Sequence, residues 1–566
     1  MAGVRGFADP NVQVNPDGHS TFQHVWARGT TAGRPCTPHT TVVWSTSGWQ
    51  PIRQSWGYFR REDIPVHFDI AEGWTVADMY QEAVMAATDP NRVVWMSGTV
   101  NNPGTPNNPD GEGDMILDNN ATPGCEEPLL NCYPFPWKTI PEYLEEAGVT
   151  WQVYQDFDNF EDNMLAYFVQ YQNSNATSPL TIHGNSYPGL AKFYADAKNG
   201  TLPQEYRIER RFASRTNLCL EVGGFGDHVV PYHAPNGTAG EWIEDPYGSA
   251  GYTPIGPGFR IPFYIISPWT RGGRVFTEHA DHTSQILFLE AWLEALGYQG
   301  VQSKEIPPWR REHMSNLVNA FDFDKPDYSL PNIAAAIPPL TEPLNSSEYS
   351  GNLSLGSLTG NYIGAAKCQA QFPQTQPPVP YGPANANANL TLLVEEGFKP
   401  VRGALTEGRY LTFETEGLAL ANQDSKTVTV TPATAQHDDI RQQWIIHELE
   451  AGSNTFTIQS AVDRQYIASS SSPKLTNSSD AAQAFTIIYE KNGLYRLQVG
   501  ANSTYLSVQN GVDGTVHHNN QGCLKTGNEM IPSFSFIFAP DSRLALYVGS
   551  IYCFLSINQP LSPAAE

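Results

Sequence analysis

The segment PEYLEEAGVTWQVY, residues 141–154, places a helix and a strand next to each other in one short stretch of chain. Its first half has the composition of a helix, and Gly148 is the residue type that most often ends one. Residues 149–154 are rich in β-branched and aromatic side chains, which favour strands. A helix that leads directly into an apolar strand is typical of an α/β layered domain.

Segments of the same two kinds occur on both sides of this stretch. The pattern at 75–85 predicts a helix capped by Thr75. Residues 261–267 predict an apolar strand, which a loop connects to a helix at 283–292. Because strands that are apolar throughout suit a sheet covered on both faces, we expect residues 1–325 to form one α/β domain.

The composition changes after this region. Residues 326–392 are rich in Pro, Ser and Asn, and they predict a linker. Beyond it the helical signal disappears, so residues 393–540 predict an all-β domain, and residues 541–566 are expected to be irregular. Short pieces that contain a tyrosine recur there, at 408–412, 464–468 and 503–507. This repetition predicts a threefold, trefoil-like domain, with a plain β-sandwich as the alternative.

The charge balance excludes some classes of function. The chain has 33 Lys and Arg against 58 Asp and Glu, a net charge of −25. No basic surface is therefore available to neutralise phosphates, which argues against a nucleic-acid-binding protein. No apolar run approaches the roughly 20 residues that span a bilayer. The composition predicts a large acidic globular protein.

Several features favour export from the cell. Nine Asn-x-Ser/Thr sequons occur, at Asn120, Asn175, Asn199, Asn236, Asn345, Asn352, Asn389, Asn477 and Asn502. Together with the low lysine content they predict a secreted glycoprotein. Among the seven cysteines, Cys125 and Cys132 are close enough in the sequence for a disulfide that closes one loop. The alternative is that they are two unpaired thiols. No signal peptide follows Met1, so either the protein is cytosolic or its true N-terminus lies upstream.

The densest polar cluster lies at 221–228, where Glu221 precedes two glycines and Asp227 and His228 follow them. Glycines allow a backbone to approach a ligand closely, and carboxylates bind hard cations through oxygen. The pattern therefore predicts a metal or phosphate site. The alternative, which the local pattern alone favours, is a Gly-rich turn in which an Asp–His pair holds a loop.

Two helix starts are further candidates. Asp281 and His282 precede a predicted helix, where an aspartate commonly acts as the cap. His279 and His282 could also ligate a metal, although no HExxH motif supports zinc. Thr88 stands two residues before a proline typical of a first helical turn. Its hydroxyl, beside backbone N–H groups, suits a nucleophile that attacks phosphate, and a plain N-cap is the alternative.

Longer motifs follow one another in a specific order between residues 3 and 325. They lie at 59–67, 88–92, 223–229, 258–262, 267–273 and 281–284. In this order they resemble the phosphoesterase family of non-haemolytic phospholipases C and related acid phosphatases, and the secreted fungal members look most similar. The β-rich region after the linker also resembles the extra C-terminal domain of those fungal members.

The resemblance implies an alkaline-phosphatase-like α/β fold, in which a layered sheet carries helices on both faces. It implies hydrolysis of phosphate esters, typically of phosphatidylcholine to diacylglycerol and phosphocholine, with membrane contact only through the substrate. Thr88 would attack phosphorus, while His228 and His282 would stabilise charge and protonate the leaving group. A divalent metal of unidentified kind would bind at Glu221 and Asp227.

Some motifs of the family are missing. A Glu-Asn-Arg-Ser-Phe-Asp motif is expected before residues 3–7, and a Ser-Glu-His-Pro motif is expected before the turn at 223–226. Of an Asp-Glu metal pair only Glu221 remains. We therefore expect a truncated phospholipase C, whose missing start would explain the absent signal peptide, or a catalytically impaired paralogue.

A non-catalytic secreted binding protein is the alternative function. In that case Tyr410, Tyr466 and Tyr505 would recognise carbohydrate or a cell surface. Core positions in a threefold β domain explain these tyrosines better than a binding role does.

Overall fold

The computed structural model of the protein describes most of the α/β region and most of the β-rich region. The described residues are 44–45, 48–49, 65–86, 88–109, 124–126, 130–156, 163–209, 231–244, 251–258, 260–334, 399–415, 417–435, 437, 439–450, 452–469, 473–490, 493–500, 504–508, 516–519 and 534–538. Residues 335–392 of the linker predicted at 326–392, and the irregular end predicted at 541–566, therefore lie outside them. The domain boundaries stay predictions.

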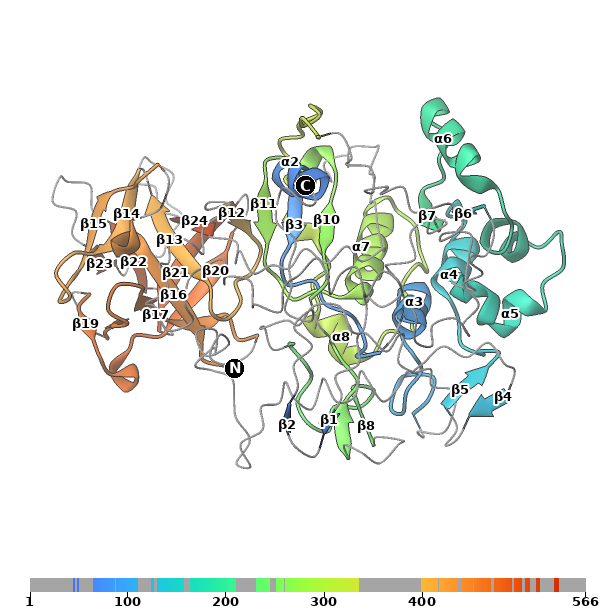
Figure 1. Cartoon of the computed structure of the whole chain (residues 1–566), viewed down its shortest axis with the longest axis horizontal. Coiled ribbons are helices and arrows are strands. Elements are labelled where there is room, and N and C mark those ends of the chain that lie inside the picture. Colours follow the sequence, from blue (N-terminus) through green and yellow to red (C-terminus); the bar gives the residue numbers. More distant parts are fainter. Residues whose placement is uncertain are drawn as a thin grey trace, which may run out of the picture.

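A small sheet forms the centre of the α/β region (Figure 1). Its middle strand is β3 (Thr75–Ala77), which pairs antiparallel with β10 (Phe263–Ile265) and parallel with β11 (Arg274–Phe276). After β3 the chain leads into helix α3 (Thr88–Ser97), and after β11 it leads into α7 (His282–Ala295). The mixture of strands and helices confirms an α/β class, and α7 confirms the helix expected at 283–292.

A second group of elements lies at the end of the molecule opposite the β-rich region (Figure 1). Here β6 (Trp151–Gln155) pairs parallel with β7 (Glu205–Glu209). Helices α4 (Ile140–Ala147), α5 (Val169–Gln172) and α6 (Gly189–Asn199) belong to the same group. The helix and strand expected at 141–154 are confirmed, since Gly148 ends α4 in a left-handed conformation.

The remaining elements are short. They are α2 (Pro65–Gly73), α8 (Pro308–His313), the hairpin β1 (Trp44–Ser45) with β2 (Gly48–Trp49), the hairpin β4 (Gly124–Glu126) with β5 (Leu130–Tyr133), and β8 (Trp242–Glu244) with β9 (Tyr252–Pro254). Cys125 and Cys132 lie on the paired strands β4 and β5, but their side chains are outside the described atoms. Their pairing stays a prediction.

The helix predicted at 75–85 is wrong. Residues Thr75–Ala77 form strand β3 instead, and the chain after it continues through a turn, two isolated bridge residues and a series of bends. Tertiary contacts decide this, because β3 lies between two other strands and Thr75 Oγ1 donates a hydrogen bond of 2.9 Å to the carbonyl of Thr270. Backbone hydrogen bonds join the following residues to Phe276, Ala280 and Ile255. Local helix propensity is weak compared with such pairing.

The described strands of the β-rich region form a closed ring, which we call the C-terminal barrel. In ring order these strands are β13 (Tyr410–Thr415), β16 (Gln443–Glu448), β17 (Thr455–Ser460), β20 (Phe485–Tyr489), β21 (Leu494–Val499) and β24 (Phe534–Phe538), and β24 pairs back with β13. All these pairings are antiparallel, which confirms an all-β region. A closed ring differs from the alternative of a plain β-sandwich, in which two separate sheets face each other.

Hairpins extend from alternate strands of this ring. They are β14 (Leu418–Asn422) with β15 (Val428–Pro432), β18 (Tyr466–Ile467) with β19 (Leu475–Thr476), and β22 (Thr504–Val508) with β23 (Val516–Asn519). The first strands of the hairpins pair with β13, β17 and β21 in turn. The same connection, from a strand of the ring to a hairpin, therefore occurs three times among the described strands.

The interpretation of the repeated tyrosines as core residues is wrong. Tyr410, Tyr466 and Tyr505 are only half-buried. The residues that follow them, Leu411, Ile467 and Leu506, are the buried ones, with exposed fractions of 0%, 0% and 1%. Side chains alternate between the two faces of a strand, so the face occupied by the tyrosines is not the face that fills the barrel.

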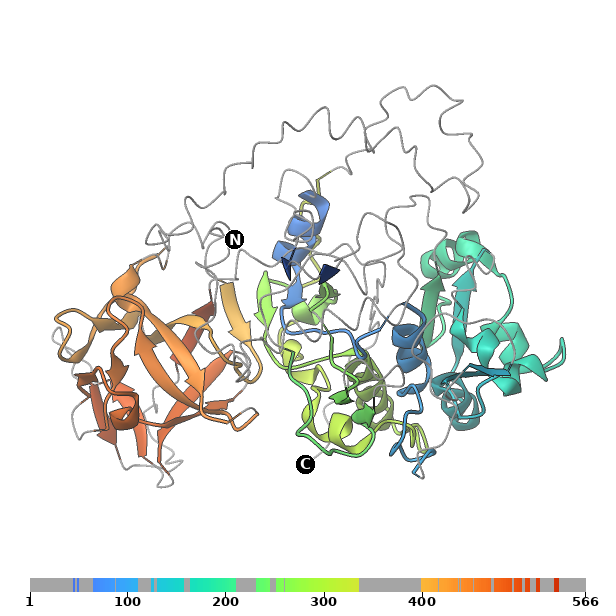
Figure 2. The same ribbon diagram turned by 60° about the horizontal axis from the view of Figure 1, so that its bottom comes forward.

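One further strand joins the two regions. Strand β12 (Lys399–Arg402) pairs parallel with β11 and antiparallel with β24, so a single sheet runs from the α/β region into the barrel (Figure 2). Val275 of β11 packs in the core of the barrel. In the part of the chain that the structure describes, no helix is long and apolar enough to cross a membrane.

Candidate active site

The candidate residues that the structure describes follow two neighbouring parallel strands. Because β3 and β11 are parallel, their carboxyl ends lie side by side. The chain leaves β3 and reaches Thr88, the first residue of α3, and it leaves β11 and reaches His282, the first residue of α7. In open α/β sheets, ligands bind outside the carboxyl ends of the strands.

The segment before Thr88 is held by Asn91 in the first turn of α3. Asn91 Nδ2 donates to the carbonyls of Val84 (3.0 Å) and Ala86 (3.2 Å), and its Oδ1 accepts from the Val84 N–H (3.1 Å). Pro90 lies in the first turn, as the sequence predicts. The side chain of Thr88 is outside the described atoms, so only its position at the start of the helix is fixed.

His282 is fully buried, and its ring contacts the chain that leaves β3. Its Nδ1 lies 2.9 Å from the hydroxyl oxygen of Tyr80, which also accepts a hydrogen bond of 2.5 Å from Gln285 Nε2. The side-chain oxygen Oε1 of Gln285 in turn accepts a hydrogen bond of 3.1 Å from Trp95 Nε1. This chain of polar contacts connects the segment after β3, the start of α7 and the side of α3.

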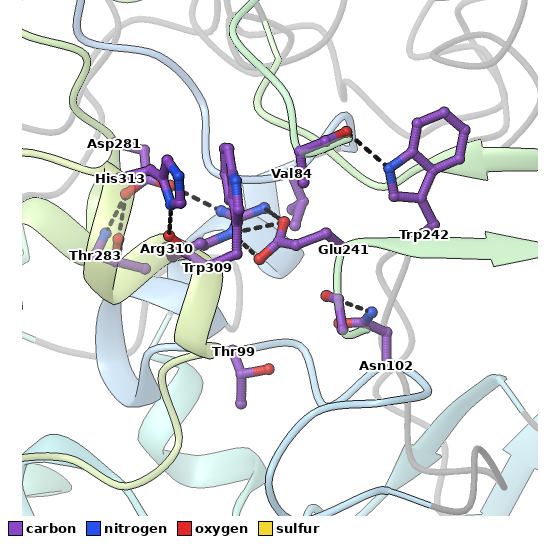
Figure 3. A network of polar contacts seen from close by, with 12 residues as sticks. Val84, Thr99, Asn102, Glu241, Trp242, Asp281, Thr283, Trp309, Arg310 and His313 are labelled. Carbon is purple, nitrogen blue, oxygen red and sulfur yellow. Dashed lines mark hydrogen bonds and ion pairs between the residues drawn. The ribbon is translucent and has the colours of Figure 1, made fainter. Parts of the chain in front are cut away.

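Asp281, the residue before His282, uses both of its carboxylate oxygens. Oδ1 accepts from the Thr283 N–H (2.8 Å), and Ser284 completes a capping box, so the expected N-cap role is confirmed. Oδ2 accepts a hydrogen bond of 2.7 Å from Nη1 of Arg310 (Figure 3). The guanidinium also binds Glu241 with both oxygens, at 2.9 to 3.1 Å.

This cluster of Arg310, Glu241 and Asp281 is almost completely excluded from solvent. Burial raises the pKa of Glu241, and the charge of Arg310 opposes that rise. Burial alone would lower the pKa of Arg310, but the two carboxylates outweigh it and raise that pKa. The arginine therefore stays charged and fixes the start of α7. Sequence reasoning missed it, because Arg310 lies 69 positions from Glu241 and 29 from Asp281.

Three of the predicted site residues lie outside the described part of the chain. They are Glu221, Asp227 and His228, all within 210–230. Within the described residues no group of three or more His, Cys, Asp or Glu side chains could hold a metal ion. The described residues therefore do not supply a set of metal ligands among themselves, and metal binding at Glu221 and Asp227 stays a prediction.

His279, considered above as a partner of His282 in metal binding, has a different environment. Its ring stacks on Tyr232 with the centroids 4.3 Å apart. Burial, together with the charge of Arg409, lowers the pKa of His279 to about 3. The residue is therefore a neutral, packed side chain across the physiological pH range.

Comparisons with known proteins agree with the order of motifs along the chain. The model of the Phosphoesterase family matches residues 12–217 and 218–294. The non-hemolytic phospholipase C of Burkholderia pseudomallei is 30% identical over 424 residues, which cover 59% of this chain and 58% of that protein. The protein of the same name from Pseudomonas aeruginosa is 32% identical over 398 residues, covering 58% and 55%.

The chain thus spans a little over half the length of these curated relatives. Among solved structures, a ricin B-like lectin of Macrolepiota procera in complex with lactose matches 24% of this chain and 98% of its own, at 15% identity and a TM-score of 0.20, too low to support an assignment. Similarity to secreted fungal members and to acid phosphatases stays a prediction. The family match covers half of the chain, and the protein therefore belongs to the Phosphoesterase family.

Proposed function

We propose that this protein is a hydrolase of phosphoric ester bonds of the phospholipase C type, cleaving phosphatidylcholine-like lipids to diacylglycerol and a phosphorylated head group. The observation that carries the proposal is the family match, which includes both strand exits and both helix starts of the candidate site. The names of the relatives, non-hemolytic phospholipases C, support the same reaction.

In the proposed reaction the Thr88 hydroxyl attacks phosphorus and the diacylglycerol oxygen leaves with a proton. Water then attacks the phosphorylated threonine and releases the phosphorylated head group, which restores the hydroxyl. The first N–H groups of a helix have no partners within it and favour an anion, which suits a threonine at the start of α3. Proton transfer to the leaving oxygen falls to His228 and His282 in this proposal. A divalent metal at Glu221 and Asp227 would polarise the phosphoryl oxygens.

Turnover of a chromogenic phosphocholine ester tests this role of Thr88. We expect Thr88→Ala to abolish turnover and Thr88→Ser to keep part of it, because serine retains the hydroxyl. The exposed Thr201 provides a matched control, since Thr201→Ala should leave the rate unchanged. Full activity of a folded Thr88→Ala variant would rule out this nucleophile.

The alternative of a secreted binding protein makes a different prediction in the same assay. A folded wild-type chain that shows no turnover, with or without added divalent metal, and that binds sugars without metal would support it. The half-buried Tyr410, Tyr466 and Tyr505 are accessible enough for such a role.

Finer structural features belong to the same proposal. The ring of strands with hairpins on alternate members supports a β-trefoil, and the parallel strands with flanking helices support an alkaline-phosphatase-like sheet. Secretion with glycosylation is supported by exposed sequon asparagines at Asn175, Asn199, Asn236 and Asn477. Mass spectrometry of the protein before and after treatment with a glycosidase tests this, and an unmodified mass from a native source would contradict it.

A further inference from the structure

The C-terminal barrel contacts the α/β region at the carboxyl ends of β3 and β11. Strand β12 continues the parallel sheet, with Val401 opposite Val275 and Arg402 opposite Phe276. Just beyond, the Thr277 N–H donates to the Arg402 carbonyl (3.2 Å), and Thr277 Oγ1 donates to the Ala404 carbonyl (2.7 Å). The chain that leads to His282 is therefore bonded, from its first residue after β11, to β12 and to the segment that connects β12 to the barrel.

A buried ion pair makes the first direct contact with the chain that leaves β3. Arg409, 5% exposed, reaches from the barrel and donates through Nη1 to Asp78 Oδ2, and Asp78 is 2% exposed. The guanidinium is oriented by Thr406, whose hydroxyl oxygen accepts from Nε (2.9 Å) and Nη2 (2.7 Å). Asp78 stands two residues before Tyr80, whose hydroxyl faces His282 Nδ1.

The second contact holds the chain that leaves β11. Glu278 Oε1 accepts a hydrogen bond of 2.9 Å from the N–H of Ala404, in the segment between β12 and β13, and one of 2.8 Å from Asn319 Nδ2. The preceding residue, Gly403, lies directly against the Glu278 side chain, and its carbonyl accepts a hydrogen bond of 2.7 Å from the Tyr495 hydroxyl. Glu278 lies four residues before His282.

We infer that the barrel helps to position the candidate active site at the carboxyl ends of β3 and β11. In this inference Arg409 is a positioning residue that holds Asp78 and thereby aligns Tyr80 and, through Tyr80, His282. This inference rests on the proposed function, since it assigns the role of a residue in that same site. Removing one partner of a buried ion pair leaves the other charge buried and unpaired, which destabilises the fold, so the test has to separate a local change in geometry from a general loss of stability. The planar fork of arginine is needed to contact Thr406 and Asp78 at once, and lysine cannot reproduce it.

Steady-state kinetics of Arg409 variants on the phosphocholine ester test the inference. We expect Arg409→Gln to lower kcat roughly 10- to 100-fold with little change in KM, as a displacement of about 1 Å does in a catalytic group. Arg409→Lys, which keeps the charge, should recover only part of the rate. The exposed Arg441, which pairs with Asp439 elsewhere on the barrel, is the matched control, and Arg441→Gln should leave kcat unchanged.

Hydrogen exchange provides a readout that does not depend on activity. In Arg409→Gln, exchange should accelerate more in peptides covering 78–86 and 279–285 than in α4 and the barrel hairpins, which report the general loss of stability. If Arg409→Gln does not fold, Asp78→Asn, which keeps the shape of the side chain, should give the same pattern. Wild-type protection in these two segments, or an acceleration there no greater than in α4 and the barrel hairpins, would overturn the inference. Absence of turnover in the folded wild type would instead defeat the proposed function and leave the exchange experiment to decide on the positioning role.

Discussion

Glu305 is a buried carboxyl group with an unusual pKa. It is 4% exposed and accepts a hydrogen bond of 3.2 Å from the Tyr143 hydroxyl. Burial raises the pKa of Glu305 from 4.5 to about 7, and the hydrogen bond from Tyr143 only partly opposes this rise. Between these two values the folded protein holds a proton that the unfolded chain has released. The free energy of unfolding therefore falls as the pH rises through this window, and it levels off above about 7.

We expect Glu305→Gln to remove this pH dependence. Glutamine stays neutral and keeps an oxygen that accepts from Tyr143, so the variant should gain stability relative to wild type at pH 8 but not at pH 4.5. The gain should amount to a few kcal/mol at most, since one pKa unit corresponds to about 1.4 kcal/mol. Urea unfolding of both proteins at the two pH values measures it, with Glu450→Gln at an exposed position as the control. Parallel stability curves of wild type and Glu305→Gln would show the assignment to be wrong.

Individual residues were predictable where their role depends on neighbours in the sequence. The cap at Asp281 and the helix end at Gly148 are such cases, because the partner atoms lie within a few positions. The bond from Asp281 to Arg310 was not predictable, since nothing near Arg310 in the sequence indicates a buried cation. Glu221, Asp227 and His228 depend on the family resemblance alone, and the described residues do not test them.

At the scale of elements, the turn after β12 is sensitive to a single methyl group. Gly403 has φ +84°, and a Cβ there would lie 2.7 Å from Glu278 Cγ. Gly408 has a similar φ of +77°, but a Cβ there would meet no atom within 4 Å. Both alanine substitutions cost about 1 kcal/mol for the left-handed backbone. We expect Gly403→Ala to lose about 1–3 kcal/mol more than Gly408→Ala, through overpacking against Glu278.

Chemical unfolding of the two glycine variants measures this difference directly. Because the shared backbone strain cancels, the comparison isolates the contact between the barrel and Glu278. Equal losses in the two variants would mean that Glu278 moves aside freely, in spite of its hydrogen bonds to Ala404 and Asn319.

Two errors in the predicted elements have one physical cause. Thr75 resembles a helix cap, so the local sequence favours a helix from residue 75, yet strands far away in the sequence pair on both sides of residues 75–77. The tyrosine repeat suggests core positions, yet the buried side chains are those one residue later, Leu411, Ile467 and Leu506. In both cases long-range strand pairing decides the structure, and a local pattern carries no information about it.

At the scale of the whole molecule, the two predicted regions are not independent bodies. The parallel pairing of β11 with β12 makes one sheet of them, and Val275 fills part of the barrel core. Composition distinguished the regions correctly as α/β and all-β. It could not indicate this joint, because β12 follows a long segment with no strand pattern of its own and pairs with a partner more than a hundred positions earlier.

This joint predicts that the α/β region and the barrel unfold together. Phe456 is fully buried in the barrel core, and Phe456→Ala should cost about 3–5 kcal/mol. If unfolding is cooperative, hydrogen exchange of the most protected amides in α3 and α7 should accelerate by the same factor as that of the barrel strands. Leu144→Ala, in the core of α4 at the far end of the molecule, provides the reciprocal test and should accelerate exchange in the barrel equally. Faster exchange confined to the barrel in Phe456→Ala would mean that the shared sheet does not couple the two regions, because the joint must then open at less cost than the unfolding of either side.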